Sequence, residues 1–209
     1  MSVSKDGWSA DTVQLIAFDF DGTITTKDTF ALFLRYYAGT LRWALNIVTL
    51  LPSFAAYGLR LIDRSAVKRH VVRRFFKGRS EDQMLERAAD FARDVIPDLI
   101  RPAALAEVKA KLARGEAVSL VSASINPYLD VWAESVNVPK VIATRLKSES
   151  GRLTGELDGV NCWGEGKLTA IEAEMGRKKY EIAEAYGDSE GDKPMLIAAK
   201  VSFYRPFRV

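Results

Sequence analysis

The sequence is poor in the residues that build disulfides and structural zinc sites, with one cysteine and one histidine among 209 residues. Cys162 has no second cysteine to pair with, which excludes both an internal disulfide and a cysteine-based zinc cluster. A cytoplasmic location is therefore expected. The first twelve residues are polar and have no basic start followed by an apolar stretch, so we predict no secretory signal.

Acidic residues are scarce in one segment, 60–79, where Asp63 stands against eight basic residues. This segment has a net charge of +7, although the whole chain has a net charge of only +3. No recognition motif or aromatic stacking platform accompanies the basic residues, so we expect no nucleic-acid partner. Two interpretations stay open, a solvated helix face or a surface that contacts anionic lipids.

The length and the hydrophobic content of 48% fit one domain with a large insertion as well as two domains. Residues 13–18 form a short apolar run that ends at Asp19, which is typical of a buried strand. The next such run, 117–121, comes about a hundred residues later. Patterns and stop signals between them predict helices over 29–38, 41–62, the basic stretch to 77, 80–96 and 102–114. We place a helical insertion at 28–100.

The second half of the chain alternates between strand and helix patterns. We predict helices over 127–136, 168–175 and 194–199, and strands over 180–186 and 201–204. Two extended pieces, 140–147 and 152–157, flank Ser150-Gly151 and are typical of a hairpin. Alternating strands and helices indicate an α/β fold with a parallel sheet, whose binding sites lie beyond the carboxyl ends of the strands.

Polar residues follow three of these predicted strands and form the candidate site. They are Asp19 and Asp21, then Ser122, then Asp188 and Asp192, with Lys167 expected on the loop before the third strand. Crowded carboxylates need a cation between them, and oxygen ligands suit Mg²⁺. A lysine, a hydroxyl and free backbone N–H groups bind a phosphate. The set predicts metal-assisted phosphoryl transfer. A calcium loop is excluded, because the required glycine and distal glutamate are missing.

These motifs resemble the signature of the haloacid dehalogenase superfamily. Residues 19–23 match its DxDGT motif, Ser122 its strand-terminal serine, Lys167 its basic residue, and Asp188 with Asp192 its closing acidic pair. The resemblance implies a three-layer, Rossmann-like parallel sheet as core domain, formed by residues 1–27 and 101–209. The insertion, 28–100, would then be an α-helical cap domain.

The resemblance also implies a role for each motif residue. Asp19 would be the nucleophile that forms an aspartyl-phosphate, and Asp21 the general acid and base. Mg²⁺ would be held by Asp19, by the backbone carbonyl of Asp21, and by Asp188 with Asp192 in close support. The phosphate-binding residues would be Gly22, Thr23, Ser122, Ala123 and Lys167. A carboxylate at position 21 favours a phosphatase over a dehalogenase.

The insertion after the first motif resembles the cap of the phosphoserine-phosphatase-like branch, subfamily IB. The branch has a substrate-binding glutamate where this chain has Asp28. It also departs from the branch at Ser122-Ala123-Ser124, where the branch has Ser-Gly-Gly, and at Gly191, where it has Asn. Asp28 and Lys68 are the candidate substrate residues of the cap.

Residues 43–59 carry no charge and include Pro52. They either pack in the core of the cap or lie at a membrane surface, where the basic segment behind them would face anionic lipid. The apolar cap, the run at 164–167 and the closing residues 204–207 resemble a bacterial subgroup with phosphatidylglycerophosphate phosphatases and probable polyprenyl-phosphate phosphatases. We therefore expect a lipid-phosphate substrate and a protein peripheral at the inner membrane face. The alternative is a soluble phosphatase for phosphoserine or histidinol phosphate.

Overall fold

A computed structural model describes residues 12–208, so the expectation about the first eleven residues lies outside the described part. Its centre is a six-stranded sheet with the order β4-β3-β2-β1-β5-β6. Neighbouring strands are parallel except β3 and β4, which are antiparallel. The strands are β1 (Val13–Phe18), β2 (Ala117–Ile125), β3 (Lys140–Glu149), β4 (Arg152–Asp158), β5 (Tyr180–Gly187) and β6 (Val201–Tyr204). This confirms the predicted α/β fold and its largely parallel sheet.

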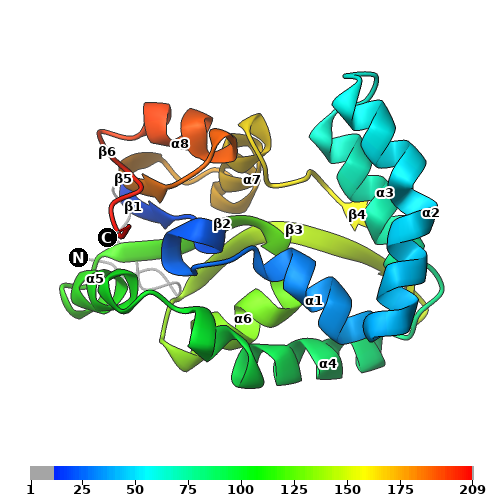
Figure 1. Cartoon of the computed structure of the whole chain (residues 1–209). Helices are drawn as coiled ribbons and strands as arrows, with labels where there is room; N and C mark the ends of the chain where they lie inside the picture. Colours follow the sequence, from blue (N-terminus) through cyan, green and yellow to red (C-terminus); the bar gives the residue numbers. More distant parts are fainter. Residues whose placement is uncertain (1–11, 209) are drawn as a thin grey trace.

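Eight α-helices and three short helical turns surround the sheet in the described residues. Figure 1 shows α7 and α8 on one face of the sheet, and α4, α5 and α6 on the other. The α-helices are α1 (Thr29–Ala38), α2 (Thr40–Gly58), α3 (Arg64–Phe76), α4 (Glu81–Asp94), α5 (Pro102–Ala113), α6 (Asn126–Ser135), α7 (Glu165–Met175) and α8 (Lys193–Ala198). The turns are η1 (Phe20–Ile24), η2 (Ile96–Leu99) and η3 (Glu190–Asp192).

Strand β1 shows why the sheet is buried on both faces. Ile16 and Phe18 pack in the larger core, with the helices α4 to α6, while Leu15 and Ala17 pack in the smaller core beneath α7 and α8. Successive side chains of a strand point to opposite faces, so a continuous apolar run fits a strand covered by helices on both sides. At the end of β1, Phe18 pairs with Leu120 of β2 and with Tyr186 of β5. The three strands therefore deliver the residues that follow them to one place.

The helices between β1 and β2 divide into two groups. Helix α4 packs against α6 of the core, whereas α2 and α3 stand as a pair at one end of the molecule (Figure 1). The predicted hairpin of β3 and β4 is confirmed, with Ser150 and Gly151 at positive φ in its turn. The hairpin supports this helix pair, because β4 packs on α3 and the Gly78 N–H donates to the Leu153 carbonyl (2.8 Å). The division into core and cap at residues 28 and 100 stays a proposal.

Three predicted element boundaries were wrong by three or more residues. Strand β2 runs on to Ile125, because a register shift lets it stay paired with β3 beyond Ser122. Helix α2 ends at Gly58, and the residues to Ile62 form a turn, with Arg60 at positive φ. Helix α7 begins at Glu165, so Lys167 lies on its first turn and not on a loop. Gly164, at a φ of 61°, allows the chain to enter the helix three residues early.

In residues 12–208, no helix is both long enough and apolar enough to cross a membrane.

Candidate active site

Three aspartates meet at the carboxyl edge of the sheet. Asp19 follows β1, Asp188 follows β5, and Asp192 ends the turn η3. Each offers a carboxylate oxygen, and these oxygens lie within 4.8 Å of one another, although all three residues are buried. Asp192 is fixed by its own turn, since it accepts from the Ser189 N–H (2.9 Å) and hydroxyl (2.7 Å). The sequence prediction that these residues converge is confirmed by the geometry.

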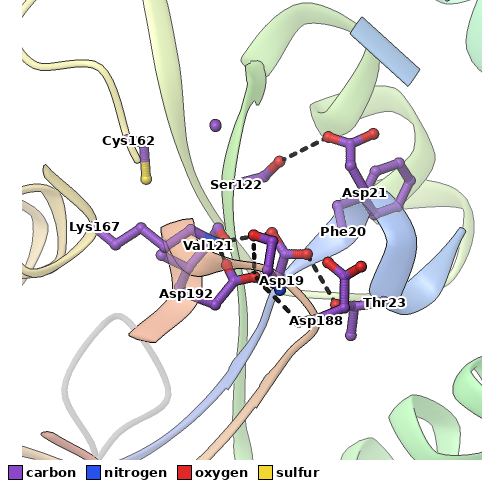
Figure 2. A network of polar contacts seen from close by, with 12 residues as sticks. Asp19, Phe20, Asp21, Thr23, Val121, Ser122, Cys162, Lys167, Asp188 and Asp192 are labelled. Carbon is purple, nitrogen blue, oxygen red and sulfur yellow. Dashed lines mark hydrogen bonds and ion pairs between the residues drawn. The ribbon is translucent and has the colours of Figure 1, made fainter. Parts of the chain in front are cut away.

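Lys167 lies between two of the carboxylates (Figure 2). Its ammonium is 2.7 Å from Asp19 Oδ1 and 2.7 Å from Asp192 Oδ1, and it donates to the Val121 carbonyl (2.5 Å). Burial lowers the pKa of Lys167, but the two aspartates outweigh it, so the pKa lies above its ordinary value. The same contact holds the pKa of Asp192 below its usual range, against the effect of burial. Lys167 is therefore a fixed cation at the centre of the site.

Asp19 is held from both sides, because its second oxygen accepts from the Thr23 hydroxyl (2.9 Å). Burial raises its pKa to about 8, Lys167 opposes this shift, and Asp192 and Asp21 add to it. Burial and Asp192 likewise raise the pKa of Asp188, which also contacts Arg208. Lys167 and Arg208 thus supply two positive charges against three carboxylates, which leaves the cluster short of positive charge. A cluster of three carboxylates offers a metal ion only oxygen ligands, and such ligands suit Mg²⁺.

Gly22 lets η1 approach this cluster. It has a φ of 82°, and a Cβ atom there would lie 2.4 Å from Asp188 Oδ2. Only glycine can adopt this positive φ without strain and also leave the space beside Asp188 free. Gly191 shows a second close approach, since a Cβ there would lie 2.2 Å from Trp163 Nε1. The departure from the branch at position 191 therefore makes room for the indole of Trp163.

The Asp21 carboxylate lies outside the cluster and points toward β2 and α1 (Figure 2). Oδ1 accepts from the N–H (2.6 Å) and hydroxyl (2.5 Å) of Thr29, and Oδ2 from the Ser124 hydroxyl (2.5 Å). Burial and the nearby Asp28 raise its pKa above the ordinary value of an aspartate. Such a group holds a proton more readily, as a general acid must. Metal ligation through the Asp21 carbonyl stays a prediction.

The predicted phosphate-binding residues lie around this edge, but they differ in access. Gly22, Ala123 and Lys167 line the pocket, together with the acidic residues of the site. Ser122 is fully buried, and its hydroxyl lies 3.4 Å from Asp21 Oδ2 and accepts from the Ser124 N–H (3.0 Å). Thr23 is also buried, and its hydroxyl donates to the Asp19 carboxylate. Their contacts with phosphate stay predictions.

The pocket has a volume of about 630 Å³ and two chemically different ends. The inner end is the acidic cluster with Lys167. The other end extends between α1, α2 and α3, and its lining is mostly apolar, although Arg64 and Lys68 of α3 also contribute to it. These apolar residues are Phe30, Leu34, Trp43, Ile47, Phe54, Tyr57, Val67 and Val71. A ligand that fills the pocket therefore combines an anionic group with an apolar one.

The two candidate substrate residues of the cap both line this pocket. Asp28 caps α1 by accepting from the Ala31 N–H (2.9 Å). Lys68 reaches from α3 to the core, donates to the Ala123 carbonyl (3.1 Å) and lies 3.1 Å from the centre of the Phe30 ring. Burial lowers the pKa of Lys68 to about 7, while Asp28 and Asp21 oppose the shift. Lys68 thus connects the helix pair to the catalytic end.

Sequence reasoning gave no site role to four polar residues. Thr29 and Ser124 orient Asp21, and Ser124 was recorded only as part of a departing motif. Arg208 contacts the Asp188 carboxylate from the C-terminal segment, and Arg205 donates to the Asp188 carbonyl (3.0 Å). A usable signal for Ser124 was its position close behind the predicted strand 117–121, although the structure places it within β2. Arg205 belongs to the closing residues 204–207 of the resemblance, which gave it no role in the site, and nothing in the local sequence pointed to Arg208.

The uncharged run at 43–59 is divided between the pocket and the surface of the protein. One side of α2 lines the pocket with Trp43, Ile47 and Phe54, and Leu50 is buried. The other side is exposed, with Leu45 57% and Val48 62% accessible. The first side fits the interpretation as a packed core, and contact of the second side with a membrane stays a prediction.

Comparisons with known proteins agree with this geometry. The family model of haloacid dehalogenase-like hydrolases matches residues 16–196. Protein CicA of Caulobacter vibrioides is 37% identical over 195 residues, which cover 93% of this chain and 86% of CicA. A probable phosphatase of Mycobacterium tuberculosis is 33% identical over 111 residues, which cover 50% of this chain and 38% of that protein.

Two solved structures share the fold. A Bordetella pertussis protein of unknown function has a TM-score of 0.76 at 25% identity, covering 90% of this chain and 87% of its own. A phosphoserine phosphatase, solved as an analogue of its phospho-aspartyl intermediate, has a TM-score of 0.57 at 20% identity, covering 92% and 86%. At this identity the second likeness concerns the fold alone.

Proposed function

This chain belongs to the haloacid dehalogenase-like hydrolase family and is a phosphatase, and we propose that it works through a phosphoryl group carried on Asp19. The observation that supports this is the position of Asp19, buried between Lys167 and two further carboxylates and open to the pocket. A nucleophilic carboxylate needs a cationic surrounding to approach an anionic phosphate. The subfamily IB resemblance is part of the proposal.

In the first step, an oxygen of Asp19 attacks the phosphorus in line with the leaving oxygen. A bond forms between that carboxylate oxygen and phosphorus, and the bond from phosphorus to the substrate's alcohol oxygen breaks. Asp21 gives its proton to the leaving oxygen, consistent with its raised pKa. Lys167, Ser122 and the backbone N–H groups of Gly22, Thr23 and Ala123 would hold the phosphoryl oxygens.

In the second step, water attacks the phosphorus of phospho-Asp19. Asp21, now a carboxylate, takes a proton from this water, and the bond between Asp19 and phosphorus breaks to release inorganic phosphate. Thr29 and Ser124 keep the Asp21 carboxylate in place between the two steps.

Mg²⁺ held by Asp19, Asp188 and the Asp21 carbonyl, with Asp192 in support, would supply positive charge against the mutual repulsion of carboxylate and phosphate. Lys167 cannot supply all of this charge, because burial and the neighbouring carboxylates still raise the pKa of Asp19 to about 8.

For the substrate we propose a membrane-lipid phosphate, such as phosphatidylglycerophosphate or a polyprenyl phosphate, taken at the inner membrane face. The apolar end of the pocket supports this, because it would desolvate an acyl or prenyl chain next to the phosphate. Asp28 and Lys68 would contact the group between phosphate and chain. A small-metabolite phosphatase is the second candidate, favoured by Asp28, whose carboxylate could bind the ammonium of phosphoserine.

The test is phosphate release by the purified protein with Mg²⁺, with Asp19→Asn as the blank. Detergent-dispersed phosphatidylglycerophosphate and a polyprenyl phosphate are compared with phosphoserine and histidinol phosphate. We expect turnover of the lipids and a loss of at least about 10⁴-fold in Asp19→Asn, since the nucleophile is gone. Turnover confined to the soluble esters would replace the lipid proposal with the second candidate. Equal turnover by Asp19→Asn would contradict the assigned nucleophile.

A further inference from the structure

Helix α2 has a continuous apolar stripe on its solvent side, which we call the outer stripe. Its residues recur every three or four positions, so they lie on one helix face. They are Leu41, Leu45, Val48, Pro52 and Ala55, followed by Leu59 at the C-cap, and all six are exposed. Leu41 is 77% accessible and Leu59 71%. No element of the described fold covers this stripe. A partner that covers it would therefore gain the free energy of burying apolar surface.

The outer stripe lies opposite the side of α2 that lines the pocket. Trp43, Ile47 and Phe54 on that side face the apolar end of the pocket. Figure 1 shows α2 as the outermost helix at this end of the molecule. One helix therefore separates the pocket that would take an apolar chain from an apolar surface that faces solvent.

Basic side chains of α3 border the outer stripe. Arg74 donates to the hydroxyl of Thr49 (2.8 Å), and His70 pairs with Ser53 (2.9 Å), so α3 lies directly beside it. A surface groove runs along this border and contains no acidic residue. Its lining is Leu50, Ser53, His70, Arg73, Arg74, Lys77 and Arg79. An apolar stripe edged by cations is complementary to a bilayer surface with anionic headgroups.

We propose that the outer stripe of α2 and the basic edge of α3 form a docking surface for an anionic membrane. The stripe enters the region between headgroups and acyl chains, and the arginines contact the lipid phosphates. This surface places the apolar end of the pocket one helix away from the lipid. The inference deepens the proposed function and rests on it for the identity of the substrate, but the docking itself is measured separately.

The test is co-flotation of the full chain with vesicles of phosphatidylcholine, with or without phosphatidylglycerol. The wild type is expected to float with the anionic vesicles and less with the neutral ones. The double variant Leu45→Glu/Val48→Glu is expected to lower the partition at least about tenfold, because it places charge on the stripe. The matched control is Ile197→Glu on α8, where the side chain is 82% accessible. Figure 1 shows α8 far from α2.

Hydrolysis of the water-soluble p-nitrophenyl phosphate serves as the folding control, because neither Leu45 nor Val48 lines the pocket. We expect it to be equal in the wild type and in the double variant, whereas turnover of vesicle-borne lipid phosphate falls with the partition. Unchanged flotation of the double variant, or no flotation of the wild type, would overturn the docking surface while leaving the phosphatase activity intact. A concentration-dependent dimer that the double variant abolishes, without vesicle binding, would instead assign the stripe to a second copy of the chain.

Discussion

The aspartate cluster and the α2–α3 helix pair lie at the two ends of one pocket and are held together by different forces. In the cluster, every charged group has a partner at a defined distance, as when Lys167 lies 2.7 Å from both Asp19 and Asp192. Helix α2 contributes apolar surface on two sides and a single charged residue, Arg42. The first region fixes its charged groups through directed ion pairs and hydrogen bonds. The second region selects a ligand or a surface by polarity and shape. Such selection tolerates much more variation in the apolar side chains.

This contrast predicts that single substitutions in the cluster cost far more than single substitutions at the other end of the pocket. The largest effect is expected for Lys167→Met, because it leaves Asp19 and Asp192 buried without their cation. We expect a loss of about 3–5 kcal/mol in the free energy of unfolding, together with a loss of turnover. Urea denaturation without added metal is the measurement.

The matched control for that experiment is Lys193→Met, which removes an ammonium paired with Glu190 on the surface. Its side chain is 56% accessible, so the free energy of unfolding should stay close to that of the wild type. Equal free energies of unfolding of the two variants would contradict the contrast, because removing the buried cation would then cost no more than removing one from a surface ion pair.

A smaller effect is expected for Gly22→Ala, which adds a Cβ atom 2.4 Å from Asp188 Oδ2 at a φ of 82°. The carboxylate must move away, and we expect a loss of about 1–3 kcal/mol in the free energy of unfolding and a lower affinity for Mg²⁺. Isothermal titration with Mg²⁺ reads the second effect without any turnover.

The control variant Gly115→Ala adds the same backbone strain without a clash between the new Cβ atom and a neighbour. Gly115 has a φ of 72°, but a Cβ atom there has no neighbour within 4 Å. It should cost only about 1 kcal/mol and leave Mg²⁺ binding unchanged. If both alanine variants bound Mg²⁺ like the wild type, the close approach of Gly22 to Asp188 would have no role in the site.

An effect of opposite sign is expected at Lys68, where the two regions meet. Burial lowers its pKa to about 7, so below pH 7 the folded protein holds a charge that burial disfavours. Lys68→Met should therefore be stabilising relative to wild type below pH 7. The difference should shrink as the pH rises from 7 toward the ordinary lysine pKa, because the native amine is then neutral. Urea denaturation at pH 6 and pH 9 measures it.

The groups facing Lys68 are Asp28 and Asp21, which favour its charge, and Arg64, which disfavours it. Arg69→Met, at an exposed neighbour on the same helix, is the control and should show no such pH dependence. Since Lys68 would contact substrate, Lys68→Met should also raise KM at pH 6 by about tenfold or less, with a smaller increase at pH 9. A stability difference that is the same at both pH values would contradict the assigned burial.

Much of the fold could be predicted because its signals are local. The apolar run before Asp19, the Ser150-Gly151 turn and the N-cap residue Ser80 each determine the conformation of a few neighbouring residues. Element ends were less predictable, as Lys167 shows. Its helix begins early because Gly164 adopts a positive φ and because burial against two aspartates stabilises that turn.

The sequence by itself determined the acidic motif residues, the alternation of strands and helices, and the expectation that strand ends converge, because parallel strands necessarily end at one edge. Only the tertiary structure decided that Thr29 and Ser124 hold Asp21, that Lys68 turns into the pocket, and that Arg208 reaches Asp188. It also decided that α2 is apolar on two opposite sides. These contacts join residues far apart in the chain, and no local pattern records which face of a helix will meet another element.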